Sequence, residues 1–145
     1  MNIVGYDIAD IPDSEVEWLW YGYLAKRNLT LLSGAPKAGK STLLFDFLKQ
    51  MKDNKPCLGL STTCAPTVLV TEESLQLVKA RSKSLGLLSA PLHVLPLQPG
   101  LSWPMVIAYT KNLIVHNNYG LVIIDTVARF WDAYDENDGR QCKNC

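Results

Sequence analysis

Apolar residues along this chain fall into two kinds of pattern, short continuous runs and stripes with helical spacing. The continuous runs predict buried strands at residues 29–33, 67–71, 92–97 and 121–125. Because their apolar positions recur every three or four residues, the stripes predict helices at 40–52, 74–85 and 102–115. Strands that alternate with helices predict an α/β fold, a mostly parallel sheet flanked by helices. Pro96 has no amide donor, so its strand is expected at a sheet edge.

The helical stripes also identify candidate core residues. In the first helix the apolar face consists of Leu43, Leu44, Phe47, Leu48 and Met51. In the third helix the residues at helical spacing are Val106, Tyr109, Thr110, Leu113 and Ile114. Ser102 is the expected N-cap of the third helix, and Pro104 fits its first turn.

A glycine-rich loop separates the first predicted strand from the first predicted helix. It fits the pattern G-x-x-x-x-G-K-[ST] and consists of Gly34, Ala35, Pro36, Lys37, Ala38, Gly39, Lys40, Ser41 and Thr42. Glycines let the backbone wrap around phosphates, and a helix N-terminus offers unpaired N–H groups and partial positive charge. Lys40 is expected to reach the β- and γ-phosphates of a nucleotide, and the Ser41 hydroxyl to bind Mg²⁺. The alternative is a glycine-rich turn before an ordinary helix.

Two adjacent carboxylates, Glu72 and Glu73, follow the second predicted strand. In doubly wound sheets, ligands bind beside the carboxyl ends of the strands. A carboxylate at that place can orient or deprotonate the water that attacks a nucleotide. The alternative is that both are first-turn acids of the next helix, capped by Ser74. The phosphate-binding loop favours a catalytic role for one of the pair.

The fourth predicted strand ends in Asp125. Such a strand buries its apolar run and delivers one carboxylate to the carboxyl edge of the sheet, where it can bind Mg²⁺ through a water molecule. Any buried strand can end in Asp, so the pattern is weak by itself. Together with the phosphate-binding loop and the strand–helix units between them, it predicts a metal site shared by Asp125 and Ser41.

Several other residues have two interpretations each. The aromatic segment 18–24 is expected to be a hydrophobic strap on the sheet edge, with adenine stacking or a partner surface as the alternative. His93 is expected to be structural. The bases of the second helix are expected on a solvated face, with phosphate contact as the alternative; they are Lys79, Arg81 and Lys83.

Composition narrows the function classes. The 145 residues are 48% hydrophobic, which suits one domain with a core. The net charge of zero excludes a global basic footprint for nucleic acid, and acids gather in residues 1–17. No apolar run is long enough to span a membrane, and no basic-plus-apolar signal opens the chain, so a soluble, cytoplasmic protein with reduced thiols is expected.

The cysteines do not combine into one obvious site. Cys142 and Cys145 have a zinc-type spacing, but Cys57 and Cys64 do not. Unpaired thiols are therefore expected rather than a zinc site or a redox pair. Arg129 is compatible with nucleotide, a neighbouring subunit, DNA or an ordinary ion pair.

Four parts of the sequence carry a resemblance to a known family. They are the aromatic segment 18–24 with the predicted strand 29–33, the loop 34–43, the segment 68–74, and the segment 121–130 with 135–138. Together they resemble the RecA-like ATPases of the RepA-type helicase group, AAA-family ATPases of plasmids, phages and mobile elements. The resemblance covers about residues 16–141. It implies ATP and Mg²⁺ as ligands, a ring or filament of identical subunits, and work on DNA. It also implies that Glu72 takes the catalytic glutamate position, with Glu73 as its neighbour.

The chain departs from that group at its end. By this resemblance, 121–125 corresponds to the strand called Walker B and 29–33 to the strand before the phosphate-binding loop. In RecA-like domains another strand follows Walker B and inserts between these two, and later segments supply DNA-contacting loops. We therefore expect an acidic lead-in at 1–17 and the N-terminal part of a RecA-like ATPase domain at 18–145. Because unpaired strand edges are costly, efficient ATP hydrolysis by this piece alone is not expected.

Two function classes follow from these motifs. The first is a DNA-linked ATPase motor or loader, in which hydrolysis switches subunit contacts. The second is a nucleotide-binding switch or adaptor that hydrolyses little. A small-molecule kinase is a weaker third possibility, because a kinase is not expected to present adjacent acids after its second strand.

Overall fold

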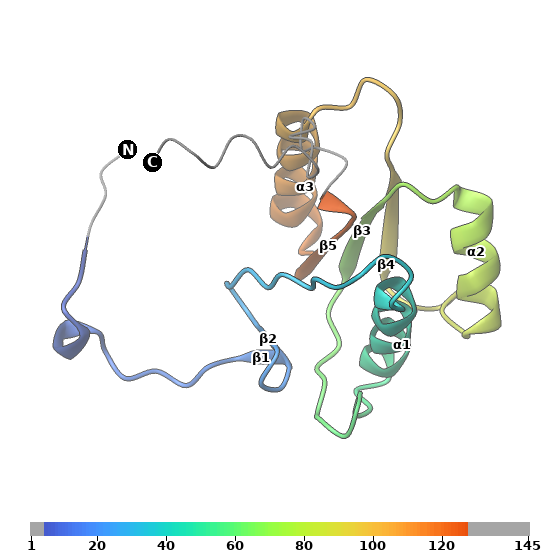
Figure 1. The fold of residues 1–145 in the computed structure, drawn as a ribbon. Coiled ribbons are helices and arrows are strands. Elements are labelled where there is room, and N and C mark those ends of the chain that lie inside the picture. Colours follow the sequence, from blue (N-terminus) through green and yellow to red (C-terminus); the bar gives the residue numbers. More distant parts are fainter. Residues whose placement is uncertain (1–4, 128–145) are drawn as a thin grey trace, which may run out of the picture.

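The structure is a computed structural model that describes residues 5–127. Its main sheet has three parallel strands in the order β4-β3-β5 (Figure 1). Their bounds are Thr67–Thr71 for β3, Leu92–Pro96 for β4 and Leu121–Asp125 for β5. Arg129, Cys142, Cys145 and the segment 135–138 lie outside the described residues. The predicted α/β class is confirmed, and Pro96 lies on an edge strand of this sheet as expected.

Three helices flank the sheet. They are α1 (Lys40–Lys52), α2 (Leu75–Ser84) and α3 (Trp103–Asn117), each within two residues of its predicted bounds. A short 3-10 helix, η1 (Ile8–Asp10), lies in the exposed lead-in. Strands β1 (Trp18–Trp20) and β2 (Leu24–Ala25) form a small antiparallel hairpin.

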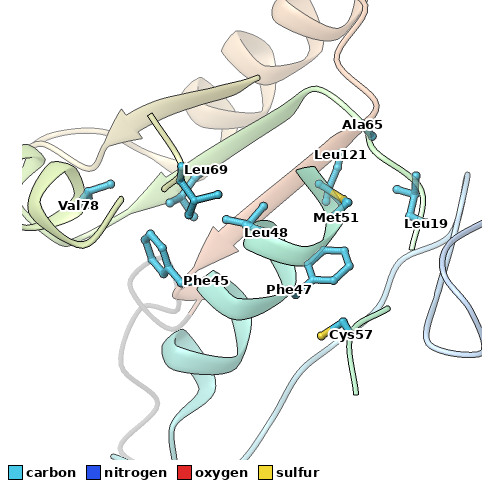
Figure 2. Packing of buried hydrophobic residues seen from close by; sticks show 11 residues of the cluster. Leu19, Phe45, Phe47, Leu48, Met51, Cys57, Ala65, Leu69, Val78 and Leu121 are labelled. Atoms are coloured by element: carbon cyan, nitrogen blue, oxygen red, sulfur yellow. The ribbon is translucent and has the colours of Figure 1, made fainter. Parts of the chain in front are cut away.

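Strand β3 is the centre of the fold because all five of its residues are buried. Successive side chains of a strand point to opposite faces. Leu69 belongs to the cluster that contains α1 and α2 residues, including Leu48 (Figure 2). Val68 and Val70 pack instead with Val106 of α3. The protein therefore has three layers, with α1 and α2 on one face of the sheet and α3 on the other (Figure 1).

The prediction of a buried strand at 29–33 is wrong. This segment has no strand assignment, and Leu29, Leu31 and Leu32 are 98%, 79% and 51% exposed. A strand is stabilised by pairing with a neighbour and by burial of its faces, not by apolar composition alone. Residues 29–33 pair with none of the described strands.

The predicted helix faces are only partly correct. In α1, Phe47, Leu48 and Met51 are buried, Leu43 and Leu44 are half-buried, and the buried Phe45 was missed. In α3, Val106 and Thr110 are buried, Leu113 is half-buried, and Tyr109 and Ile114 are 43% and 41% exposed. Ser102 holds the N-cap position of α3, but its side chain makes no capping hydrogen bond.

The aromatic strap packs partly on α1, and its buried Leu19 shares a cluster with Leu121 of the edge strand β5. The Trp20 ring stacks on Phe47, with ring centroids 5.1 Å apart. The Trp20 indole also donates a hydrogen bond of 3.1 Å to the carbonyl of Cys57. Leu19 is 2% exposed, whereas Tyr21 and Tyr23 remain 56% and 60% exposed. The indole ties the hairpin to the loop that follows α1.

Replacing Trp20 by Phe is expected to lower the free energy of unfolding by about 1–2 kcal/mol. The substitution keeps an aromatic ring near Phe47 but removes the donor to the Cys57 carbonyl. Urea unfolding followed by circular dichroism measures the change. Tyr23→Phe, at an exposed position of the same hairpin, is the matched control and should change the free energy by less than about 0.5 kcal/mol. Equal stability of the Trp20→Phe protein and the wild type would contradict the expectation.

Candidate nucleotide-binding site

The carboxyl ends of β3 and β5 lie side by side at the point where the order in which the chain adds strands to the sheet reverses. From β3 the chain passes through α2 on one face to β4, then returns through α3 on the other face to β5. Thr71 at the end of β3 lies opposite Asp125 at the end of β5. In open α/β sheets, ligands bind in the crevice outside the strand ends at such a switch point.

The glycine loop brings the start of α1 to the same edge of the sheet. Gly39 is the N-cap of α1 and has φ 90°, a left-handed conformation that favours glycine. Lys37 is also left-handed, with φ 62°. Residues 34–39 are exposed, so their backbone is accessible to a ligand. The first helical bond runs from the Leu43 amide to the Gly39 carbonyl at 2.9 Å. The preceding amides of a helix are left without partners inside it, which suits an anion.

Lys40 folds back over this loop. Its ammonium donates hydrogen bonds to the carbonyls of Gly34 at 2.8 Å and of Ala35 at 2.9 Å. Both bonds are exposed to solvent. The cation is thus already held above the concave side of the loop, where a phosphate group would compete with the two carbonyls for it.

Ser41 and Asp125 are in direct contact although they come from different elements. The Ser41 hydroxyl donates a 2.7 Å hydrogen bond to Oδ2 of Asp125. A hydroxyl and a carboxylate are oxygen ligands of the kind that a hard cation such as Mg²⁺ prefers. Mg²⁺ is usually bound by one or two protein groups, substrate phosphates and waters. Two side chains are enough for that arrangement, and no larger group of metal-binding side chains occurs in residues 5–127. These residues therefore fit the ion.

The two glutamates after β3 have different surroundings. Glu72 is exposed, and its backbone amide donates to the Asp125 carbonyl at 3.3 Å. Glu73 is half-buried, and its Oε1 accepts a 2.8 Å hydrogen bond from Nη2 of Arg81. The backbone therefore holds Glu72 at the crevice, beside Asp125, while the Glu73 side chain is engaged by α2.

Sequence reasoning missed the contact of Arg81. Lys79 and Lys83 are exposed, as a solvated face predicts, but Arg81 is half-buried. The available signal was spacing: Arg81 lies three residues after the buried Val78, so both fall on the same side of α2. Ser74 is the N-cap of α2, and its side chain accepts from the Leu77 amide at 3.4 Å. Neither glutamate therefore lies within α2 itself, contrary to the first-turn alternative.

The remaining candidate residues lie away from this crevice. His93 is on β4, where its Nε2 lies 3.3 Å from the hydroxyl of Tyr109, in agreement with a structural role. Cys57 and Cys64 are free thiols. Burial raises the pKa of the Cys57 thiol, with a smaller contribution from the nearby Asp46 carboxylate. No helix in the described part of the chain has the length and hydropathy to cross a bilayer.

Alkylation of the native protein at neutral pH is expected to modify Cys64 much faster than Cys57. Cys57 is 1% exposed and its pKa is raised, so both access and the thiolate fraction are low, whereas Cys64 is half-buried. Fragmentation of the tryptic peptide 53–79, which contains both cysteines, distinguishes the two sites by mass spectrometry after timed iodoacetamide treatment. Urea-unfolded protein is the control, since both thiols should then react at similar rates. Equal rates in the native protein would contradict the burial of Cys57.

Comparisons with known proteins agree with this geometry. Residues 6–145 match the family described as an AAA domain. Over 115 residues the chain is 31% identical to the DNA repair protein RadA of Helicobacter pylori strain 26695 and 30% identical to RadA of strain J99. Each alignment covers 79% of this chain but 22% of RadA, so the chain spans about a fifth of the length of these relatives. No solved structure matches significantly. Since almost its whole length matches, the chain belongs to the AAA domain family, with the α/β fold of a RecA-like P-loop domain.

Proposed function

We propose that this chain binds ATP with Mg²⁺ at the crevice between the glycine loop and β5, and that it serves an ATPase working on DNA. The observation that carries the proposal is the 2.7 Å contact between the Ser41 hydroxyl and the Asp125 carboxylate. This contact joins the loop that suits phosphates to the strand end that suits a metal ion.

Each residue of the crevice has a separate part in this proposal. The amides at the start of α1 bind the phosphate oxygens, and Lys40 exchanges its two carbonyl partners for the β- and γ-phosphates. Ser41 and Asp125 would hold Mg²⁺, which neutralises charge on the transferred phosphoryl group. Glu72 orients the attacking water and accepts its proton, because the residue is exposed and its backbone amide bonds the Asp125 carbonyl.

The link to DNA rests on resemblance and on relatives. The segments 18–32, 34–43 and 68–74 resemble the RepA-type helicase group, which favours replication or recombination as the process. The relatives RadA are named for DNA repair. We infer a role in DNA recombination, repair or replication, with identical subunits in a ring or filament and with 18–145 as the N-terminal part of the ATPase domain.

Equilibrium binding of a fluorescent ATP analogue tests the proposal. Affinity is expected to fall at least tenfold when Mg²⁺ is removed with a chelator, because the triphosphate then loses the ion that Ser41 and Asp125 steady. Phosphate release should rise when single-stranded DNA is added. Binding that is equally weak with and without Mg²⁺ would contradict the proposed site.

A nucleotide-binding switch with little hydrolysis is the second candidate. It is favoured by the exposed segment 29–33, which leaves the glycine loop without a strand to anchor its N-terminal side. Positioning errors of about 1 Å can cost about 100-fold in rate while binding persists. Tight Mg²⁺-dependent binding without DNA-stimulated phosphate release would select this candidate over the motor.

A further inference from the structure

Arg81 joins three parts of the protein that surround the crevice. It projects from α2, its Nη2 donates to Oε1 of Glu73 at 2.8 Å, and its guanidinium lies 4.7 Å from the centre of the Phe45 ring. Phe45 is a buried residue of α1, the helix that begins at the glycine loop. Planar guanidinium groups favour both of these contacts, the carboxylate hydrogen bond and the stack on an aromatic face.

The side chains of Arg81 and Glu73 are 36% and 31% exposed, but one polar atom of each is buried without a hydrogen bond to another described residue. Oε2 of Glu73 and Nη1 of Arg81 are both inaccessible to solvent and have no hydrogen-bond partner. Each charge is partly removed from water and is compensated by the other, so each residue helps to hold the other in place. If either residue were neutralised alone, the other charge would have to turn toward a new partner.

We propose that Arg81 is a positioning residue that selects which of the two adjacent glutamates acts in the crevice. By binding the Glu73 carboxylate from α2, Arg81 leaves the exposed Glu72, whose backbone amide bonds the Asp125 carbonyl, as the carboxylate that acts in the crevice. The inference rests on the proposed ATPase function and deepens it. No sequence pattern identified Arg81 for this role, since it shares α2 with two exposed lysines.

The reason for such a device is electrostatic. A second unpaired carboxylate next to Glu72 and Asp125 would compete with the phosphates for Lys40 and with Asp125 for the magnesium ion, and it would repel the triphosphate. Arg81 compensates that charge at a distance of 2.8 Å. In the crevice, Glu72 then remains for the attacking water and Asp125 for the metal ion.

Arg81→Met tests the inference, because methionine keeps an apolar stem over Phe45 but frees Glu73. In steady-state assays of the full chain with DNA, kcat is expected to fall about tenfold while KM for MgATP changes less than about threefold. Adding Glu73→Gln to Arg81→Met should restore kcat to the level of Glu73→Gln alone, since no unpaired carboxylate remains. Arg81→Lys, which keeps the charge but not the planar fork, should lie between Arg81→Met and the wild type.

Lys79→Met is the matched control, an exposed cation on the same helix, and should leave both kcat and KM unchanged. Thermal unfolding and binding of the fluorescent ATP analogue check that every variant is folded and retains its nucleotide site. If Arg81→Met is too unstable, the same test compares kcat of Arg81→Lys with kcat of the double variant Arg81→Lys/Glu73→Gln. Recovery in the double variant supports selection between the glutamates.

Two results overturn the inference and differ from failure of the proposed function. The first is an Arg81→Met variant with the kcat of the wild type. The second is a double variant as slow as Arg81→Met, which would mean that Arg81 merely supports the fold. If instead the wild type neither binds MgATP nor releases phosphate, the proposed function fails, and the role of Arg81 fails with it.

Discussion

Lys40→Ala is expected to weaken binding of MgATP by about 100-fold or more. Lys40 would make two charge-assisted hydrogen bonds to phosphate, each worth about 1.5–3 kcal/mol, and a factor of ten in affinity corresponds to about 1.4 kcal/mol. Without nucleotide the ammonium bonds two exposed carbonyls, so its removal should cost the fold little. Titration with a fluorescent ATP analogue in the presence of Mg²⁺ measures the affinity.

Lys49→Ala is the matched control for that experiment. Lys49 is an exposed lysine of the same helix, outside the loop. Its replacement by alanine removes the same charge and the same length of side chain as Lys40→Ala does. Its variant should bind MgATP as the wild type does. If Lys40→Ala also retained full affinity while remaining folded, the glycine loop would not be the phosphate site, and the function proposed here would be wrong.

Glu72→Gln is expected to reduce ATP turnover by about 100- to 10,000-fold while MgATP binding changes little. The amide has the size of the carboxylate but cannot accept a proton from water, and general-base catalysis contributes a factor of this order. Glu72 lies beside Asp125 through the backbone bond between its amide and the Asp125 carbonyl, so the change is confined to the crevice. Single-turnover phosphate release at saturating ATP isolates this step.

Glu15→Gln makes the same chemical change in the exposed lead-in and should not alter turnover. Glu73→Gln provides the comparison within the pair. If Glu73→Gln stopped turnover and Glu72→Gln did not, the roles of the two glutamates would be exchanged, and Arg81 would be holding the catalytic group itself.

Most of the fold could be predicted from the sequence because its signals are local. The runs at 67–71 and 121–125 are strands in the structure, and the helix at 40–52 has its predicted bounds. The run at 29–33 carries a similar signal but forms no strand. A short apolar segment becomes a strand only where a neighbouring strand supplies hydrogen-bond partners, and that neighbour cannot be identified from the segment's own residues.

In the candidate site, too, some features could be predicted from local sequence, and others depend on contacts between distant parts of the chain. The glycine loop could be found because consecutive residues define it, and Asp125 could be placed near Ser41 because parallel strands end at one edge of a sheet. The contact of Arg81 with Glu73 and Phe45 could not be found in this way. The spacing from Val78 gives the side of α2 on which Arg81 lies, but the partners of Arg81 depend on how α1 and α2 are placed on the face of the sheet.

The exposed leucines before the glycine loop have a practical consequence for handling this protein. Leu29, Leu31 and Leu32 form an apolar, strand-prone stretch whose backbone has no ladder partner within residues 5–127, which is a template for pairing with the same stretch of another molecule. At neutral pH the chain has no net charge to keep molecules apart. Concentrated solutions near pH 7 should therefore self-associate through this stretch, and a more alkaline buffer should keep the protein dispersed.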